Sequence, residues 1–258
     1  MSAHRTSPAT IAPARGPRPD PARGVFETLL VRHGRPIELE AHLARLESSV
    51  RSLYGAPCPR DVRELTLDQA EGISLGRLRV TVAPNLDGLP AAAIRAATVP
   101  SAVVFPSWNQ AATVTGLMVE GGLGAHKWAD RRLLEAAQAG GELFLPLVLD
   151  ADGTVLEASR ANVFLVDGGT IATPRADGRI LPGVTRARVT DVAGRLGIPV
   201  REEAVSLDRL LAADEVFLSG SIRGVEPVRS WAHAREWPPG QLTPLLSDHV
   251  RRLWETDR

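Results

Sequence analysis

The succession of short strand-like segments in the second half of the chain most constrains its fold. Four segments combine apolar and β-branched residues over a few positions each, at residues 113–119, 143–149, 155–157 and 162–166. Turns at Asp152-Gly153 and Gly168-Gly169 end two of them. Many short strands in succession favour a barrel-like antiparallel sheet over a doubly wound parallel one. Helical patterns accompany these strands at residues 130–139, 184–196 and 241–254. We therefore expect a barrel-like sheet flanked by helices.

The first half of the chain is predicted to form a smaller α+β domain. Apolar residues recur at steps of four and three, which is typical of one helix face, at Leu39, Leu43, Leu46, Val50 and Leu53. Further segments are a weaker helix and three strands, expected at residues 61–71, 25–31, 77–83 and 96–105. We expect an α+β protein with a disordered or extended leader, a small domain, a linker and a larger domain, at residues 1–23, 24–106, 107–110 and 111–258.

Composition excludes several classes of function. The formal net charge is zero, which disfavours a nucleic-acid or membrane-surface partner. Cys58 is the single cysteine, so an intramolecular disulfide is impossible, and the scattered histidines have no metal-ligand spacing. We expect no metal site. No apolar run approaches the length of about 18 residues that spans a bilayer, and no secretory signal is expected. These features predict a cytoplasmic protein.

Lys127 is the only lysine, although Lys and Arg together number 30. A guanidinium keeps its proton at ordinary pH and cannot act as an amine nucleophile. A lysine amine can lower its pKa on burial and form a Schiff base. Lys127 is therefore a candidate for covalent chemistry, although a single lysine could also survive by chance.

Three further features suit pyridoxal phosphate, which needs a lysine for its aldehyde, a partner for its ring nitrogen and donors for its phosphate. Glu157 ends a short strand and could pair with the ring nitrogen. Gly183-Val184-Thr185 opens a helix, where free N–H groups favour an anion. Gly220-Ser221-Ile222 is a second turn that can donate N–H and hydroxyl groups. Each feature alone also fits an ordinary strand end, helix start or turn.

Together, these segments resemble the class IV aminotransferases, the fold-type-IV pyridoxal-phosphate enzymes. The resemblance rests on motifs in a fixed order, which are Gly24-Val25-Phe26-Glu27-Thr28, His42-Leu43-Ala44-Arg45-Leu46, Lys127, the segment 157–164, Leu181-Pro182-Gly183-Val184-Thr185-Arg186 and Ser219-Gly220-Ser221. It implies that Lys127 is the Schiff-base lysine and Glu157 the partner of the pyridine nitrogen. It implies phosphate contacts from Arg45, Val184, Thr185 and Ser221, with Ile222 in the same turn. It also implies a two-domain fold with the cofactor between the domains, usually in a homodimer.

Within the family, the chain is most similar to 4-amino-4-deoxychorismate lyases, in particular to the lyase half of fused synthase–lyase proteins. Thr28 falls where lyases carry a threonine that helps protonate the departing enolpyruvyl carbon. Arg131 and Arg223 are candidates for binding substrate carboxylates, although each could instead pair with a neighbouring acid. The resemblance thus implies conversion of 4-amino-4-deoxychorismate to 4-aminobenzoate and pyruvate, with an aminodeoxychorismate synthase as a candidate partner.

Two other functions stay open. One is an aminotransferase of the same family that acts on branched-chain or D-amino acids. The other is a catalytically silent binding subunit, against which the complete lysine, glutamate and phosphate-loop set argues. The leader departs from the family pattern, because a Pro-rich segment replaces the strand and Asp-Arg-Gly-type turn that usually open the chain. That segment is expected either to shorten the first domain or to pair in an unforeseen way.

Overall fold

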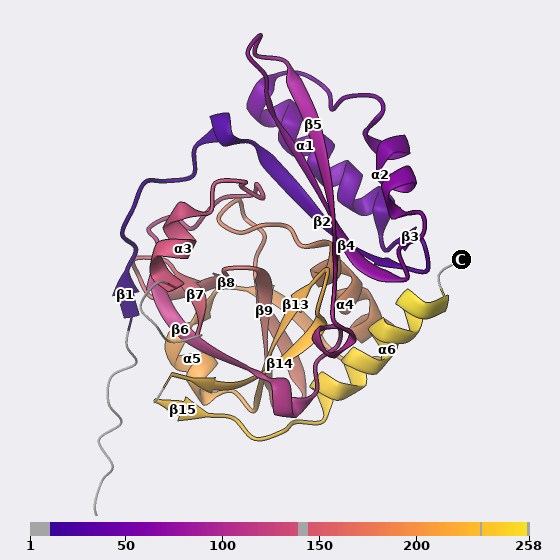
Figure 1. The fold of residues 1–258 in the computed structure, drawn as a ribbon. Helices are drawn as coiled ribbons and strands as arrows, with labels where there is room; N and C mark the ends of the chain where they lie inside the picture. Colours follow the sequence, from indigo (N-terminus) through magenta and orange to yellow (C-terminus); the bar gives the residue numbers. More distant parts are fainter. Residues whose placement is uncertain (1–10, 139–143, 233, 257–258) are drawn as a thin grey trace, which may run out of the picture.

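The computed structural model describes residues 11–138, 144–232 and 234–256. The first domain is a small antiparallel sheet covered on one face by two helices (Figure 1). Its strands run in the order β3-β2-β4-β5, with bounds Arg35–Pro36, Val25–Arg32, Leu75–Pro84 and Pro90–Thr98. The helices are α1 (Leu39–Tyr54) and α2 (Val62–Ala70). Helix α1 and strand β2 lie close to their predicted positions.

The alternation of side chains along β2 gives this sheet two different faces. Val25 and Leu29 pack against Leu46 and Val50 of α1 in one core cluster. Leu30 belongs instead to a cluster shared with the larger domain. The face of β2 that carries Leu30 therefore turns toward the larger domain, and the two domains share a continuous apolar contact.

The larger domain contains a ring of strands that closes on itself. Its members, in order around the ring, are β8 (Thr154–Ala158), β9 (Ala161–Asp167), β13 (Glu215–Gly220), β14 (Gly224–Trp231), β6 (Ala112–Met118) and β7 (Leu145–Leu149), and the pairing of β9 with β8 completes it. Strands β10 (Thr170–Pro174) and β11 (Val200–Glu203) extend from β9, while β12 (Val205–Ser206) and β15 (Arg235–Glu236) pair with β8 and β14. Strand β6 pairs in parallel with both β14 and β7. The ring is therefore mixed rather than wholly antiparallel as expected.

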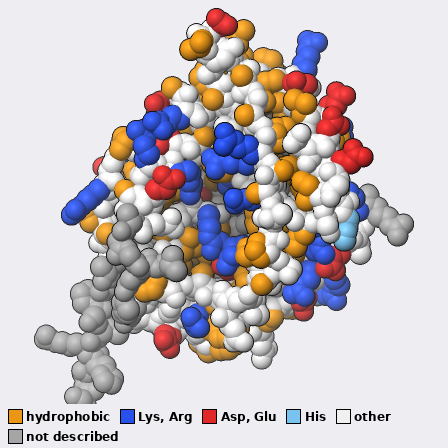
Figure 2. Space-filling model, viewed as in Figure 1, with side chains coloured by type: hydrophobic (Ala, Val, Ile, Leu, Met, Phe, Trp, Pro, Cys, Tyr) orange, Lys and Arg blue, Asp and Glu red, His pale blue; other side chains and the backbone are white. Residues whose placement is uncertain are grey.

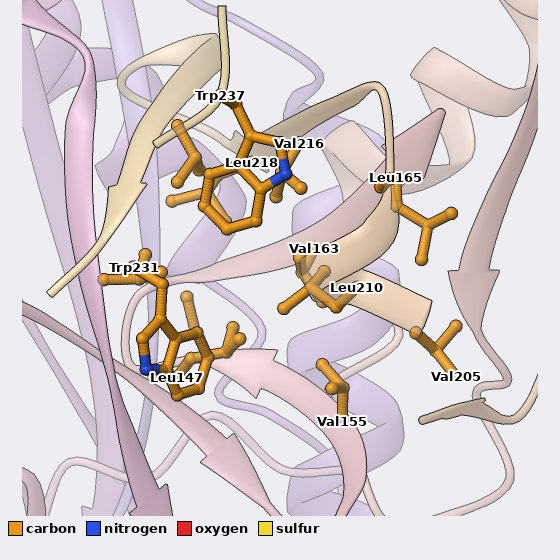
Figure 3. Close-up of a cluster of buried hydrophobic side chains, with 14 of the residues drawn as sticks. Leu147, Val155, Val163, Leu165, Val205, Leu210, Val216, Leu218, Trp231 and Trp237 are labelled. Carbon is orange, nitrogen blue, oxygen red and sulfur yellow. The ribbon is translucent and has the colours of Figure 1, made fainter. Parts of the chain in front are cut away.

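Each strand of the ring divides its apolar residues between two sides. Val163 and Leu165 of β9 point into the ring, where they meet Leu218 and Trp231 in the core cluster drawn in Figure 3. Phe164, between them, points outward and stacks on Phe217 with ring centroids 4.8 Å apart. Helices α4 (Val184–Arg195) and α6 (Leu242–Thr256) cover this outer side, whereas α3 (Arg132–Gln138) and α5 (Leu207–Ala212) lie elsewhere around the ring (Figure 1). The two-domain α+β fold with a barrel-like sheet and flanking helices is confirmed.

Over residues 11–23 the leader is extended and partly paired, which is one of the alternatives that the sequence left open. Strand β1 (Ile11–Pro13) pairs in parallel with β6, and a short 3-10 helix follows at Pro21–Arg23. The chain then runs up the left side of the view in Figure 1, from β1 to the start of β2. Residues 1–10 of the expected leader lie outside the described residues. Pairing with β6 satisfies backbone groups that composition alone suggested would stay solvated.

Other differences are local. The third strand of the small sheet, β5, lies at Pro90–Thr98 rather than at 96–105, and the segment after it contains a 3-10 turn at Ser101–Val103. The expected linker contains another, at Trp108–Gln110. Strands β10 and β14 had not been predicted. Among the described residues, no helix combines the length and apolar character needed to cross a membrane.

Candidate active site

A cavity lined by charged, polar and apolar side chains lies between the two domains. It receives residues from α1, from the segment before α3, from the ends of β8, β9 and β13, and from the start of α4. Pro19 of the leader also lines it. Figure 2 shows basic side chains gathered around a hollow on this face. The cavity contains Lys127, Glu157, Arg45, Val184, Thr185, Ser221 and Arg131 from the predicted set.

Lys127 reaches the cavity from a segment that is tied to the small sheet. Its carbonyl oxygen accepts a hydrogen bond from the N–H of Phe26 at 2.8 Å, and Ala129 N–H donates to Gly24 O at 2.9 Å. Trp128 bridges to Val25 and donates its indole N–H to Leu123 O at 2.7 Å. The lysine is therefore held on both sides by backbone contacts, and its half-buried side chain extends into the cavity.

The surroundings of Lys127 lower the pKa of its ammonium group. Burial and the positive charge of Arg45 together bring the pKa from 10.5 to about 8, while Glu27 opposes the change. At this pKa about a tenth of the amine is unprotonated at pH 7, far more than at the ordinary pKa. The side chain can therefore add to an aldehyde and can also exchange a proton with a substrate.

A β-bulge turns Glu157 toward the cavity. Leu149 pairs with Val155 and Val148 pairs with Glu157, so Leu156 is an extra residue in β8. Val155 points into the ring, while Leu156 packs outside it with Val148. Without the extra residue, strand alternation would send Glu157 into the apolar interior of the ring. The bulge instead places its carboxylate on the outer, cavity-lining side.

Glu157 is a buried carboxyl group with little compensation from the protein. Its Oε2 accepts one hydrogen bond, from Leu181 N–H at 3.2 Å. Burial raises its pKa to about 8, although that hydrogen bond and the charge of Lys127 oppose the rise. Among the described residues, no cation lies within ion-pair distance of it. A protonated pyridine nitrogen would supply the missing charge, so the site fits the ring of pyridoxal phosphate.

The start of α4 forms an anion-binding end of the cavity. Gly183 is the residue before the helix, and no side chain caps its first N–H groups. A Cβ on Gly183 would lie 1.9 Å from Asn162 Oδ1, so glycine allows the helix start to pack against β9. Val184 and Thr185 follow and line the cavity. Uncapped N–H groups and the helix dipole favour a phosphate here.

Arg45 reaches the same end from α1 and is held by a buried acid. Its Nε and Nη2 donate to the two carboxylate oxygens of Glu27, each at 2.7 Å, and its Nη1 donates to Pro182 O at 2.9 Å. His42 Nδ1 lies 2.7 Å from Glu27 Oε2. Burial alone would raise the pKa of Glu27, but the charge of Arg45 and the hydrogen bonds from His42 and Arg45 lower it to about 2. Sequence reasoning missed Glu27 and His42; a charged residue inside an otherwise apolar strand was the available signal.

The turn after β13 contributes polar groups on the other side of the anion-binding end of the cavity. Ser221 lines the cavity, and so does the buried Ser219, whose hydroxyl has no hydrogen-bond partner among the described residues. The side chain of Ile222 packs instead against the outer core of the ring. Any cofactor contact from Ile222 must therefore come from its backbone, and that role stays a prediction.

The structure separates the two arginines proposed for substrate. Arg131 lines the cavity and donates to Ser159 O. Arg223 does not line the cavity, because its Nε pairs with the buried Glu226 at 2.8 Å. Arg160, which had not been predicted, lines the cavity, but it also binds Glu226 through both terminal nitrogens. Arg223 is thus engaged in an ion pair, the second of the two possibilities raised for it.

Thr28 lies close to the site without lining the cavity. It is half-buried on β2, two residues after Phe26, and therefore on the same face of the strand. The Lys127 Nζ lies 5.1 Å from the centre of the Phe26 ring. The role of Thr28 in protonating the departing carbon stays a prediction.

Comparison with known proteins agrees with this site. The family model described as amino-transferase class IV matches residues 24–117 and 126–231. A segment of 103 residues is 47% identical to branched-chain amino acid aminotransferase 2, chloroplastic, of Humulus lupulus, and covers 38% of this chain and 25% of that protein. The matched segments span 25 to 38% of the length of such curated relatives.

Solved structures match nearly the whole chain. The crystal structure of 4-amino-4-deoxychorismate lyase from Pseudomonas aeruginosa has a TM-score of 0.75 and 30% identity, over 90% of this chain and 91% of that one. A hypothetical aminotransferase from Mycobacterium tuberculosis in its PLP-bound form has a TM-score of 0.76 and 24% identity, over 92% and 90% of the two chains. The family model covers well over half of this chain, and the cavity holds the lysine, the buried glutamate and the anion-binding helix start that the cofactor needs. The chain therefore belongs to the class IV aminotransferases, a family of pyridoxal-phosphate enzymes.

Proposed function

We propose that this protein is a lyase that converts 4-amino-4-deoxychorismate to 4-aminobenzoate and pyruvate. The observation that carries the proposal is the likeness to the Pseudomonas aeruginosa lyase, at 30% identity over nine-tenths of both chains. The curated branched-chain aminotransferases are more similar in sequence, but only over 33 to 40% of this chain. Arg131, which lines the cavity, and Thr28, which lies on the same face of β2 as Phe26, add chemical support.

In this proposal each residue has one task. When bound, pyridoxal phosphate supplies an electron sink for the carbon that bears the substrate nitrogen. Lys127 removes the proton from that carbon, and Glu157 keeps the ring nitrogen protonated. Arg45 and the start of α4 hold the phosphate. The ether bond to the neighbouring carbon then breaks. Thr28 passes a proton to the methylene carbon of the departing enolpyruvate and regains one from the Lys127 ammonium group, which returns the lysine to its neutral form. The ring becomes aromatic, which makes the step favourable.

A second candidate is an aminotransferase that acts on branched-chain amino acids. The identity of 47% to the Humulus lupulus enzyme and of 42% to the Escherichia coli enzyme favours it. Both functions need the same cofactor contacts, so Lys127, Glu157 and Arg45 do not discriminate between them. The residues that contact the rest of the substrate discriminate between the two functions.

The test is to incubate the loaded protein with 4-amino-4-deoxychorismate made in situ and to measure 4-aminobenzoate and pyruvate. Equimolar formation of both products is the expected result. In parallel, L- and D-amino acids are offered with a keto acid acceptor. Sustained amino transfer without 4-aminobenzoate would establish the second candidate instead. A colourless protein that takes up no pyridoxal phosphate would point to a silent binding subunit and contradict both.

We further propose that the enzyme acts in the cytoplasm as a homodimer, as the family resemblance implies, with a synthase supplying its substrate. Light scattering during size-exclusion chromatography tests the dimer. A mass of one chain at all concentrations, with full activity, would contradict it.

A further inference from the structure

Strands β2 and β4 carry polar side chains on the face that turns toward the larger domain. Thr28 on β2 lies directly opposite Arg79 on β4 in the antiparallel register. Side chains of such a pair share one face of the sheet, with Cβ atoms about 5 Å apart. Phe26 lies on this face as well, whereas Glu27 points the other way, to Arg45 of α1. Thr28 and Arg79 are therefore neighbours beside Phe26.

Arg79 also lies close to the reactive lysine. Its guanidinium carbon is 3.8 Å from the centre of the Phe26 ring, and Lys127 Nζ is 5.1 Å from the same point. The guanidinium and the amine are therefore no more than about 9 Å apart. Arg79 is half-buried over the Phe26 ring. Like Thr28, it lies beside the cavity without lining it.

Arg79 and Arg131 differ from the other arginines near the site in having no acid partner. Arg45 is paired with Glu27, and both Arg160 and Arg223 are paired with Glu226. Within the described ranges, no carboxylate lies within ion-pair distance of Arg79 or Arg131. Partly buried guanidinium groups without a counter-ion are suited to binding an anion.

We propose that Arg79 binds the enolpyruvyl carboxylate of 4-amino-4-deoxychorismate, while Arg131 binds the carboxylate on the ring. This inference rests on the proposed lyase function and names residues that select its substrate. The enolpyruvyl group is attached to the carbon next to the one that bears the amine. With that amine-bearing carbon within reach of Lys127, the enolpyruvyl carboxylate falls within the short span that separates Lys127 from Arg79.

The position of Thr28 supports the same assignment. The carbon that gains a proton during lysis is bonded to the carbon that bears the enolpyruvyl carboxylate. A residue that grips this carboxylate must therefore lie beside the residue that donates the proton. Thr28 and Arg79 meet this requirement because they are cross-strand neighbours. A branched-chain substrate would instead bring an apolar side chain near an unpaired guanidinium, which is unfavourable.

The test compares binding of two unreactive probes to the loaded protein by titration calorimetry. Chorismate carries both carboxylates and lacks the 4-amine, and 4-hydroxybenzoate carries only the ring carboxylate. Arg79→Gln should weaken chorismate binding by about tenfold to a hundredfold, as expected for loss of a charge-assisted pair, and change 4-hydroxybenzoate binding by less than about twofold. Arg79→Lys should recover part of the loss, since it keeps the charge without the planar fork.

Arg77→Gln is the matched control, because Arg77 lies on the same face of β4 but opposite Leu30 rather than Thr28. It should leave the affinity for chorismate within about twofold of the wild-type value. Equal losses in Arg79→Gln and Arg77→Gln, or equal losses for both probes, would overturn the role of Arg79.

If the wild type forms 4-aminobenzoate in that case, the proposed function still stands. If chorismate binding depends on Arg79 but no 4-aminobenzoate forms, the carboxylate site stands and the lyase function fails. If the wild type neither binds chorismate nor forms product, both fail.

Discussion

Replacement of Glu27 by Gln tests the network that holds Arg45 at the anion-binding end of the cavity. Glu27 is 1% exposed, and its two oxygens receive three hydrogen bonds of 2.7 Å, two from Arg45 and one from His42. Glutamine keeps the shape of the side chain but removes its charge. It also leaves the Arg45 guanidinium, which is 10% exposed, without a counter-ion.

The size of the effect follows from two separate arguments. Burial alone would raise the pKa of Glu27, yet Arg45 and His42 lower it from 4.5 to about 2. At about 1.4 kcal/mol per pKa unit, this shift corresponds to about 3 kcal/mol of stability. Removal of one partner from a buried ion pair costs about 3–5 kcal/mol in other proteins. We therefore expect Glu27→Gln to lower the free energy of unfolding by about 3–5 kcal/mol at neutral pH.

The pH dependence has a definite sign. Because folding lowers the pKa of Glu27, its contribution is fully present above the unfolded value of 4.5 and is lost as the pH falls toward about 2. The difference in unfolding free energy between wild type and Glu27→Gln should therefore shrink between about pH 5 and about pH 3. Urea unfolding followed by circular dichroism measures it at each pH.

Glu40→Gln is a matched control on the same domain. Glu40 pairs with Arg63 at 3.0 Å, but the two side chains are 71% and 59% exposed. Exposed pairs contribute about 0–1 kcal/mol, so this variant should lose less than about 1 kcal/mol. Glu27→Gln should also bind pyridoxal phosphate more weakly, because Arg45 is no longer held beside Pro182. A loss no larger than that of Glu40→Gln would refute the reasoning.

Three further predictions concern the cofactor. Lys127→Ala should abolish covalent attachment of pyridoxal phosphate, so that borohydride reduction leaves the mass of the protein unchanged in mass spectrometry; a labelled variant would contradict the assignment. Gly183→Ala should weaken binding of pyridoxal phosphate by about 1–3 kcal/mol, since its Cβ would lie 1.9 Å from Asn162 Oδ1. Gly194→Ala, in open space on the same helix, should instead stabilise the fold by about 0.5–1 kcal/mol and bind normally in an equilibrium titration; equal affinities in the two variants would refute this account of the helix start. Burial and nearby Arg45 lower the pKa of Lys127 to about 8, and only the neutral amine attacks an aldehyde. The rate of covalent attachment to the cofactor-free protein, followed by visible absorbance, should therefore rise with pH and level off above about pH 8; a continued rise to about pH 10 would mean that the lysine keeps its ordinary pKa.

Much of the site could be predicted from the amino-acid sequence, because some of its residues have a chemistry that no other residue of the chain offers. Lys127 is the single amine side chain, and no arginine could replace it in covalent chemistry. The apolar stripe of α1 and the start of α4 after Pro182-Gly183 follow from local patterns, which neighbouring residues largely determine. These features needed no knowledge of the tertiary structure.

The orientation of Glu157 and the partners of the arginines could not be read in this way. A bulge at Leu156, set by pairing with β7, turns Glu157 out of the apolar ring. Glu226 pairs with Arg160, which is 66 residues away, and also holds Arg223. Arg79 and Lys127, from different parts of the chain, both lie near the Phe26 ring. The leader likewise gains its order from β6, about a hundred residues later in the chain.

The amino-acid sequence by itself determined which groups can do chemistry and which local elements carry them, because side-chain type and short-range periodicity are properties of neighbouring residues. Only the tertiary structure decided strand register, the closure of the ring and which charges are neutralised. Those depend on contacts between segments far apart in the chain, whose hydrogen-bond and ion-pair partners no local pattern specifies.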